Sequence, residues 1–515
     1  MKKIIVIGSG FAGLSAASFM AKAGWKTIVL EKHITPGGRA RQLKGEDFRF
    51  DMGPSWYWMP DVYERYFNAF GKKVSDYYTL KRLDPSYRVV WPKNENNSGK
   101  SQIASNITGS DLLQDHETDI PADLEELKKI FEQWEPGAGG KLDAFLAEAR
   151  IKYETGMQNL VYKPGLSLKE YADKDTLSKI LRLDIFTSLK KHIRKYFKHP
   201  RIRQLLEFPG LFLGALPKDT PALYSLMNYA DMIGGTWYPD GGMYSVVLGM
   251  YSLAQELGVE FYFEMEVTGF RIKEDNIKSV FCNSFTFEAD LVINSADYNF
   301  VEQKLLPEKF RMYTSAYWEK RKMAPSCLVY YIGIDKKLKK AIHHTLFFDS
   351  SFDRHAKEIY KTKSWPDEPL FYVSVTSVTD RSVAPEGYEN LFFLVPVAAG
   401  LTGDTEEMRE KYFDRILERF EKHIGEKIKS SIVFKDSFAY SDFVEEYNSF
   451  KGNAYGLANT LLQTAVFKPS CKSSKINNLY FTGQLTVPGP GVPPCLISGE
   501  VVAGVANSEH LNHQP

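Results

Sequence analysis

The stretch KIIVIGSGFAGLSAASFMAKAGWKTIVLE, residues 3–31, decides the fold class. It reads as an apolar strand, a glycine-rich turn, a helix and a second apolar strand. The turn carries Gly8, Gly10 and Gly13 in the spacing G-x-G-x-x-G. Glu31 ends the second strand, near the spacing of about 20 residues typical of an acid that binds a ribose. Glycines let the backbone approach a pyrophosphate closely. The N–H groups at the helix N-terminus can then donate hydrogen bonds to it. We therefore predict an α/β fold that opens with a Rossmann-like dinucleotide-binding unit.

A second glycine-rich turn follows, in PGGRA at 36–40, and FDMGPS comes after it at 50–55. A domain for NAD would continue into another strand–helix–strand unit at this point. The added turn suits a longer cofactor, with Arg39 near a phosphate or a flavin and Gly53-Pro54 allowing close approach of the backbone. The alternative interpretation is that Gly37-Gly38 forms an ordinary turn.

The length of 515 residues predicts two or three domains. Strand-like pieces return at ADLVINSAD (289–297), which ends in Asp297, and at INNLYFTGQ (476–484), ahead of a glycine-rich loop and a helix. We expect a discontinuous dinucleotide-binding domain made of residues 1–90, 239–300 and 471–515. A mixed α+β substrate domain would comprise residues 91–150 and 301–470, with a helical region at 151–238.

The composition excludes several classes of protein. Lys and Arg number 65 against 64 Asp and Glu, so the chain is not a general nucleic-acid binder. Four cysteines without a C-x-x-C pair are too few for a disulfide framework or a structural zinc site. Adjacent His343 and His344 would point to opposite faces of a strand, so no metal site is predicted. No apolar run reaches the length of about 18 residues that a transmembrane helix needs.

One segment is strongly basic. Residues 185–204 contain seven bases and no acid, and they read as a single amphipathic helix ahead of the apolar run 208–216. One interpretation is docking on an anionic membrane surface, with the bases for approach and the apolar run for insertion. The other is a solvated helix with one face on the core. The bases are Lys190, Lys191, Arg194, Lys195, Lys198, Arg201 and Arg203.

Together these motifs resemble the FAD-dependent carotenoid desaturases of the bacterial phytoene-desaturase type. The likeness covers nearly the whole chain. Its most particular stretches are WYPDGGMYSVV at 237–247, SVTDRSVAPEG at 377–387 and NNLYFTGQLTVPGPGVPPCLISGEVVAG at 477–504. The resemblance implies FAD as cofactor, a carotenoid as substrate and a cytoplasmic protein held peripherally at the cytoplasmic membrane.

The resemblance also implies site residues. Where the family has a suggested catalytic aspartate, FLAEAR at 145–150 has Ala147, which leaves Glu148 and Arg150 as candidates. The residues expected to bind the cofactor, including those of the two glycine turns, are Gly8, Gly10, Gly13, Glu31, Lys32, Gly38, Arg39, Gly53, Pro54, Ser55, Val267, Asp297, Gly483, Gln484, Val492 and Pro493.

The expected reaction removes two hydrogens from a carotenoid, one of them as a hydride to the flavin. The loop GQLTVPGPGVPP resembles the branch that forms the 3,4 double bond of an acyclic or hydroxylated carotenoid end. Phytoene desaturation, carotenoid isomerisation and amine oxidation are alternatives, and either oxygen or a quinone could reoxidise the cofactor. A different class is a non-enzymatic escort protein for prenylated GTPases, which the complete glycine motif with Glu31 disfavours.

Overall fold

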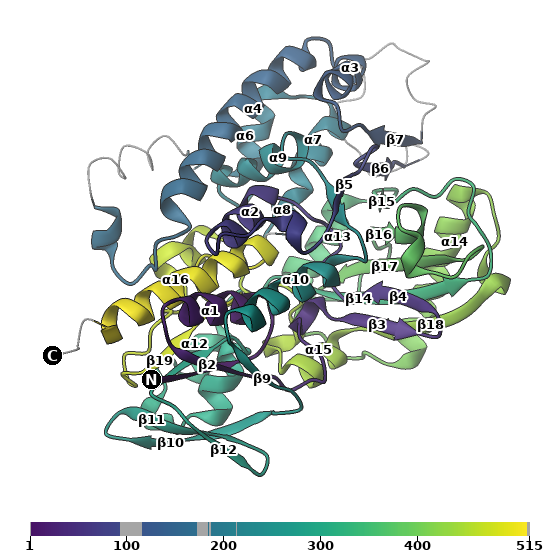
Figure 1. The fold of residues 1–515 in the computed structure, drawn as a ribbon. Coiled ribbons are helices and arrows are strands. Elements are labelled where there is room, and N and C mark those ends of the chain that lie inside the picture. The colour runs from purple at the N-terminus through teal and green to yellow at the C-terminus, as the bar shows by residue number, and fades with distance from the viewer. Residues whose placement is uncertain (1, 93–115, 173–183, 185–186, 213, 512–515) are drawn as a thin grey trace.

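The computed structural model describes residues 2–92, 116–172, 184, 187–212 and 214–511 (Figure 1). Two larger sheets organise these residues, and a layer of helices lies over both of them at the top of Figure 1. The arrangement confirms the predicted α/β class.

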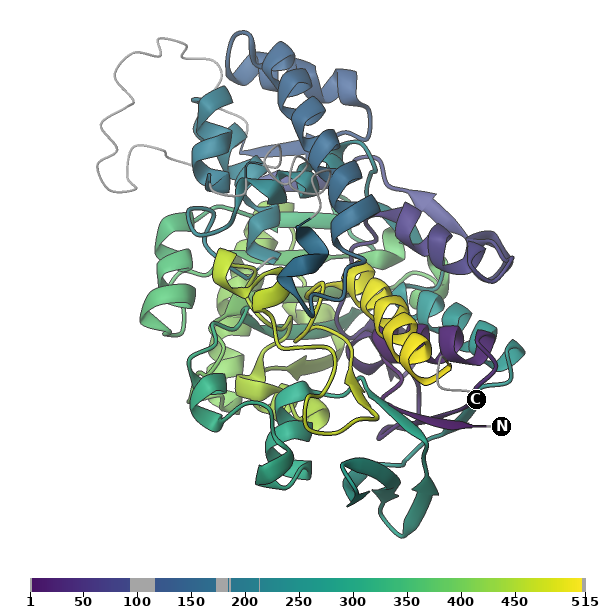
Figure 2. The same ribbon diagram turned by 90° about the vertical axis from the view of Figure 1, so that its left-hand side faces the viewer.

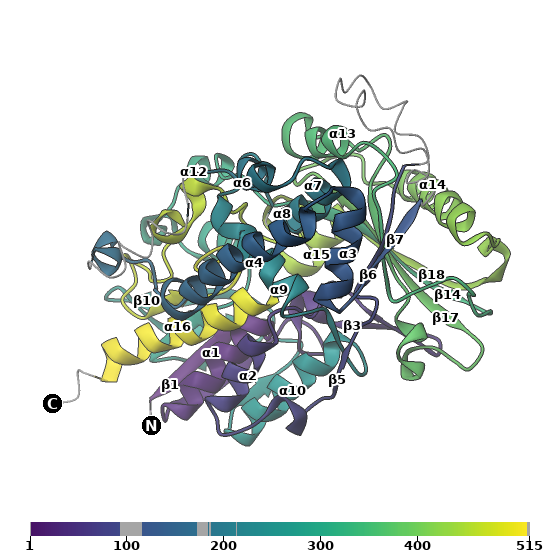
Figure 3. The same ribbon diagram turned by 90° about the horizontal axis from the view of Figure 1, so that it is seen from above.

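The first sheet is parallel and has five strands in the order β19-β13-β1-β2-β9. Its strands come from three separate stretches of the chain, and all of them except the edge strand β9 are mostly buried. Figure 3 shows α1 (Phe11–Lys22) and α16 (Val492–Leu511) side by side against this sheet. The strands are β1 (Lys3–Ile7), β2 (Lys26–Leu30), β9 (Glu260–Tyr262), β13 (Leu291–Asn294) and β19 (Leu479–Phe481).

Close packing explains the third glycine of the first motif. A Cβ on Gly13 would lie 2.0 Å from the carbonyl oxygen of Gly8, so only glycine lets α1 start directly after the turn. The start of α16 differs from the expected one, because residues 492–499 are helical and not part of the preceding loop. Pro493 and Pro494 permit this, since proline is tolerated in the first helical turn, where no intrahelical N–H bond is lost.

The second sheet has seven strands in the order β18-β14-β17-β16-β15-β6-β7, and α14 (Glu406–Ile424) covers its outer face. All neighbouring pairs are antiparallel except β15 with β6. Strand β6 belongs to the stretch 1–90 that was assigned from the sequence to the cofactor domain. In the structure it is part of this second sheet, because it pairs with β15, far along the chain. The strands are β6 (Tyr87–Val90), β7 (Glu117–Ile120), β14 (Ser326–Ile334), β15 (His344–Phe347), β16 (Phe371–Ser374), β17 (Glu389–Val397) and β18 (Ile432–Phe438).

Smaller elements complete the frame. A three-stranded antiparallel sheet hangs below the first sheet in Figure 1, and α10 (Met243–Glu256) packs beside α1. The small sheets contain β3 (Gln42–Gly45) with β4 (Phe48–Asp51), β5 (Leu80–Arg82) with β8 (Trp237–Pro239), and β10 (Val267–Lys273) with β11 (Asn276–Cys282) and β12 (Phe285–Glu288).

The helical layer corrects one prediction. The basic segment does not form a single helix from 185 to 204, because α6 (Leu189–Tyr196) ends before Pro200 starts α7 (Pro200–Glu207); residue 185 lies outside the described residues. The layer also contains α3 (Leu124–Trp134), α4 (Ala138–Thr155), α8 (Pro209–Phe212) and α9 (Leu226–Met232).

The apolar run after the basic segment is not a free surface. Phe208 and Ala215 are 2% and 4% exposed, and Pro209 and Gly210 are buried as well. These four residues belong to the core, so they cannot supply the membrane insertion that the sequence suggested. Among the described residues, no helix is long and apolar enough to cross a membrane.

Candidate active site

A cavity of about 310 Å³ opens at the carboxyl ends of β1 and β2. The strand order turns around at β1, which is where parallel sheets bind their ligands. Most residues expected to bind the cofactor line this cavity, namely Gly8, Gly10, Glu31, Lys32, Gly38, Arg39, Gly53, Pro54, Val267, Asp297, Gly483, Gln484 and Val492.

Glu31 joins two loops at the wall of this cavity. Its side chain is buried, and Oε2 accepts hydrogen bonds from the Ser9 backbone N–H at 2.8 Å and the Ser9 hydroxyl at 2.6 Å. Oε1 accepts from the His33 N–H at 2.9 Å. The carboxylate is therefore fixed beside the first glycine turn, where an acid would face the ribose of a dinucleotide.

Arg39 is a half-buried cation with one buried nitrogen, Nε, that makes no hydrogen bond to the described residues. Its Nη2 donates to Ser449 Oγ at 3.0 Å and to the Asn453 carbonyl at 3.3 Å. Burial lowers the pKa of Arg39, and nearby Asp297 opposes that shift. A guanidinium with an unused buried donor fits a phosphate or the polar edge of a flavin.

Asp297, which follows β13, fixes the backbone of two segments at the wall of the cavity. Its carboxylate accepts from the N–H groups of Phe300 at 3.0 Å and Phe450 at 3.2 Å. Gln484 also lines the cavity, and its buried Nε2 has no partner among the described residues. Glycine turns, a fixed acid and two unused buried donors together fit FAD.

Three predicted residues lie outside this cavity. Gly13 packs α1 against the turn below it. Ser55 and Pro493 line a second cavity, of about 460 Å³, whose other walls are mainly aromatic and aliphatic. The two cavities meet, because both are lined by Gly53, Pro54, Leu394, Tyr455, Gly491 and Val492.

The second cavity was not predicted residue by residue. Its walls come from the helical layer, the seven-stranded sheet, the loop before α16 and the segments 53–59 and 352–360. They include Trp56, Phe208, Met227, Phe348, Ile359 and Tyr360. Such residues look like ordinary core positions in a sequence, and the high aromatic content of 14% was the only signal of a large apolar cavity.

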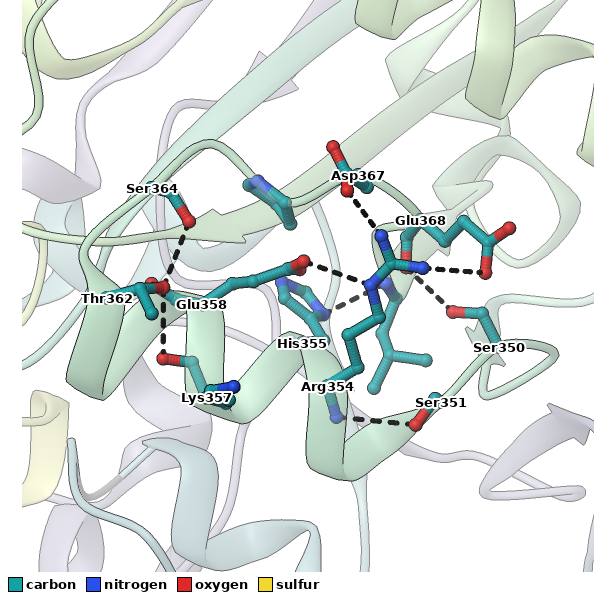
Figure 4. Close-up of polar contacts among 12 residues, drawn as sticks. Ser350, Ser351, Arg354, His355, Lys357, Glu358, Thr362, Ser364, Asp367 and Glu368 are labelled. Atoms are coloured by element: carbon teal, nitrogen blue, oxygen red, sulfur yellow. Dashed lines mark hydrogen bonds and ion pairs between the residues drawn. The ribbon is translucent and has the colours of Figure 1, made fainter. Parts of the chain in front are cut away.

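One wall of this cavity is α13 (Phe352–Lys357), which continues as a π-helical turn to Thr362. Figure 4 shows Arg354 on the outer side of α13, paired with Glu358 at 3.1 Å and with Asp367 and Glu368. His355 joins the wall to the sheet, since Nδ1 accepts from the Leu370 N–H at 2.9 Å and Nε2 lies 3.0 Å from the Pro396 carbonyl oxygen. Burial lowers the pKa of His355 to about 4, so the ring is neutral at physiological pH.

The adjacent histidines support another wall. His344 stacks on Trp56 with ring centroids 4.3 Å apart, and its Nδ1 lies 2.6 Å from the Tyr372 hydroxyl. His343 Nδ1 lies 2.7 Å from Thr379 Oγ1. Burial lowers the pKa of both imidazoles, so they act as neutral structural groups.

Glu148 and Arg150 lie on α4 and line neither cavity. The side chain of Glu148 is 49% exposed and accepts a hydrogen bond from Tyr196. That of Arg150 is 63% exposed and pairs with Glu154 at 2.7 Å. This placement contradicts the catalytic role suggested for them, because neither can touch a substrate in the cavity.

The sequence matches the family described as "Flavin containing amine oxidoreductase" over residues 11–507. A carotenoid 3,4-desaturase of Haloarcula japonica is 40% identical over 501 residues, 97% of each chain. A zeta-carotene-forming phytoene desaturase of Myxococcus xanthus is 30% identical over 97% of this chain and 93% of its own. Among crystal structures, an oxidoreductase from Methanosarcina mazei aligns with a TM-score of 0.62 at 14% identity, covering 98% of this chain and 100% of the other, which supports the fold.

These similarities agree with the geometry of the first cavity and decide against the escort-protein alternative. The chain belongs to the flavin-containing amine oxidoreductase family and, within it, to the carotenoid desaturases, and it is an FAD-dependent oxidoreductase.

Proposed function

We propose that the protein introduces the 3,4 double bond into an acyclic or hydroxylated carotenoid. The observation that carries this proposal is the junction at Gly53, Pro54, Gly491 and Val492, where an apolar cavity meets the FAD cavity. A polyene in the second cavity would present one end of its chain to the cofactor at that junction. Phytoene desaturation is the alternative, and the 40% identity to a carotenoid 3,4-desaturase, against 30% to a phytoene desaturase, favours the first.

The reaction takes a hydride and a proton from neighbouring carbons and leaves a double bond between them. Bound FAD supplies the hydride acceptor. The protein contributes binding and exclusion of water. Burial of apolar surface stabilises the bound polyene by about 25 cal/mol per Å², and the neutral walls around His344 and His355 place no charge beside it. Oxygen or a quinone would then reoxidise the cofactor.

Pigment analysis tests the reaction. The protein would be co-expressed with enzymes that make either an acyclic carotenoid with saturated 3,4 bonds or phytoene, and the products would be separated and identified by mass and absorption. We expect a loss of two hydrogens at the 3,4 position of the first substrate and no change in phytoene. Conversion of phytoene alone would establish the alternative.

We further propose peripheral docking on a membrane, because a carotenoid dissolves in lipid and must enter the second cavity from there. Two loops at the edge of that cavity, 164–168 and 461–467, carry large exposed apolar side chains. A Cβ on Gly165 would lie 3.4 Å from the Ala465 carbonyl group, so the loops touch, and Figure 2 shows the blue and the yellow-green segments side by side. These mouth loops expose Leu166 (42%), Leu168 (69%), Leu461 (40%), Leu462 (73%) and Phe467 (54%).

The mouth loops replace the apolar run as the inserting surface, because Phe208, Pro209, Gly210 and Ala215 of that run are buried. The basic helix α6 keeps its proposed electrostatic role. Helix α6 packs on the turn Ala222–Ser225, and Leu223 and Tyr224 of that turn line the same cavity. Basic side chains on a helix that packs against the wall of this cavity suit an anionic lipid surface, at about 1 kcal/mol per Lys or Arg. On this proposal the protein is cytoplasmic and bound at the inner face of the membrane.

Flotation with anionic liposomes separates the two contributions. Replacing Leu168, Leu462 and Phe467 with Ser should reduce binding at all salt concentrations. Replacing Lys191, Arg194, Lys195 and Lys198 with Gln should reduce it mainly at low salt. Exposed apolar residues elsewhere, Phe285→Ser with Val433→Ser, provide the control. Undiminished binding of both multiple variants would place the docking surface elsewhere.

A further inference from the structure

Among the described residues that line the second cavity, Asn459 carries a polar group that makes no hydrogen bond within the protein. Most of the other polar side chains of this cavity are engaged within the protein. Both ring nitrogens of His355 contact backbone groups, and Tyr372 pairs with His344. Thr464 donates to the Thr460 carbonyl at 2.9 Å.

Asn459 is different. Its Oδ1 accepts a hydrogen bond from Lys468 Nζ at 3.1 Å, and its Nδ2 has no acceptor among the described residues. Asn459 lines the cavity, whereas Lys468 does not and is 5% exposed. Burial lowers the pKa of Lys468 to about 7, and its amino group donates to the amide oxygen, so the NH₂ group is left for the cavity. In a cavity with mainly apolar walls, an unused donor costs free energy until an acceptor fills its place.

The position of this donor is informative. A Cβ on Gly489 would lie 3.1 Å from both Asn459 Oδ1 and Lys468 Nζ, so the pair packs directly on that glycine. Gly489 is two residues from Gly491, which lines both cavities, and two residues span at most about 7 Å. The Asn459 amide therefore lies near the junction where the reacting end of the substrate meets the cofactor.

We propose that Asn459 recognises a hydroxyl group at or near the reacting end of the carotenoid, and that Lys468 is the positioning residue that orients its amide. This inference rests on the proposed function, and it adds the residue that would select a hydroxylated carotenoid over a hydrocarbon. A hydrocarbon end would leave the amide desolvated and unpaired, so the site discriminates against it. An alcohol accepts the hydrogen bond, and its carbon atom lies a short way along the chain from the bond that is oxidised.

The test compares two substrates with the FAD-loaded, full-length enzyme in detergent micelles. One is an acyclic carotenoid with a tertiary hydroxyl at its end, and the other is the matching hydrocarbon. We expect Asn459→Leu to lower kcat/KM for the hydroxylated substrate about 10- to 100-fold and to leave the value for the hydrocarbon nearly unchanged, since only the former loses a bond. Asn459→Asp keeps a partner for Lys468 but removes the NH₂ group, and should lose the same preference.

Two further variants separate positioning from general packing. Lys468→Met should reduce the preference for the hydroxylated substrate, mainly by raising its KM, because the Asn459 amide can then rotate. Thr464 also lines the cavity, but its hydroxyl is already hydrogen-bonded within the protein. Thr464→Val should therefore leave the ratio of the two kcat/KM values, hydroxylated substrate to hydrocarbon, unchanged. Equal losses for both substrates in the Asn459 variants would overturn the inference, as would equal kcat/KM values in the parent enzyme. If the FAD-loaded parent converts neither substrate, the proposed function fails and the inference fails with it.

Discussion

The two cavities are built on different principles. The FAD cavity is made of backbone turns and a few charged side chains whose spacing along the chain is fixed, such as Gly8, Gly10 and Glu31. The substrate cavity is made of side chains from distant segments, such as Trp56, Phe208 and Ile359, which only the fold brings together. A substitution in the FAD cavity should therefore reduce the amount of bound FAD. A substitution in the substrate cavity should reduce turnover and leave FAD binding unchanged.

The largest expected effect is on the cofactor side. Gly13→Val would place side-chain atoms against the Gly8 carbonyl, since even a Cβ would lie 2.0 Å away. The turn would have to move, and we expect nearly complete loss of bound flavin, measured as flavin absorbance per mole of purified protein. Gly504→Val, on α16 with no atom within 4 Å of the added Cβ, is the matched control. Normal flavin content in the Gly13 variant would contradict the view that the close packing of this turn is needed for FAD binding.

Glu31→Ala should be the next most severe change. The ribose would lose a charge-assisted partner worth about 1.5–3 kcal/mol per hydrogen bond, so the Kd for FAD should rise about 100-fold. Fluorescence titration of the apoprotein measures it. Glu31→Gln keeps the shape and should fall between the parent and the alanine variant. An unchanged Kd for FAD in the Glu31→Ala variant would show that Glu31 does not contribute to FAD binding.

Much of the cofactor side could be predicted because it depends on local rules. A βαβ unit tolerates few residues at its turn, and Glu31 directly follows β2, which pairs with the nearby β1. The substrate cavity follows no such rule. Ile359 and Phe208 look like core residues in any helix, and their exposure to a cavity depends on how α13 and α8 pack. The basic segment was misread as one helix because the four-residue spacing of apolar residues such as Leu189, Ile193 and Phe197 outweighed Pro200. The mouth loops have no periodic pattern at all.

A substitution in the wall should affect the second cavity alone. Ala356→Trp fills space that the polyene needs, because Ala356 lies on the inner side of α13. We expect kcat/KM to fall about tenfold or more, as overpacking costs about 1–3 kcal/mol, with normal flavin content. Ala147→Trp, on the exposed side of α4, is the matched control. Loss of flavin in the Ala356 variant would show that the cavities are not independent.

The smallest expected effect concerns the ion pairs outside the same wall. Arg354→Ala removes the contacts to Glu358, Asp367 and Glu368 (Figure 4). Exposed pairs contribute little, so KM should change less than about threefold and flavin content not at all. High salt should reproduce the effect in the parent enzyme. A tenfold loss of activity would mean that α13 depends on these pairs for its position.

Anaerobic single-turnover mixing tests the central claim most directly, namely that the substrate cavity delivers a carotenoid to FAD at the junction. FAD-loaded enzyme would be mixed with one equivalent of the hydroxylated carotenoid, without oxygen or quinone, and both chromophores followed by absorbance. The account predicts that oxidised flavin disappears in step with the red shift of the lengthened polyene. Formation of the desaturated product while the flavin stays oxidised would contradict it.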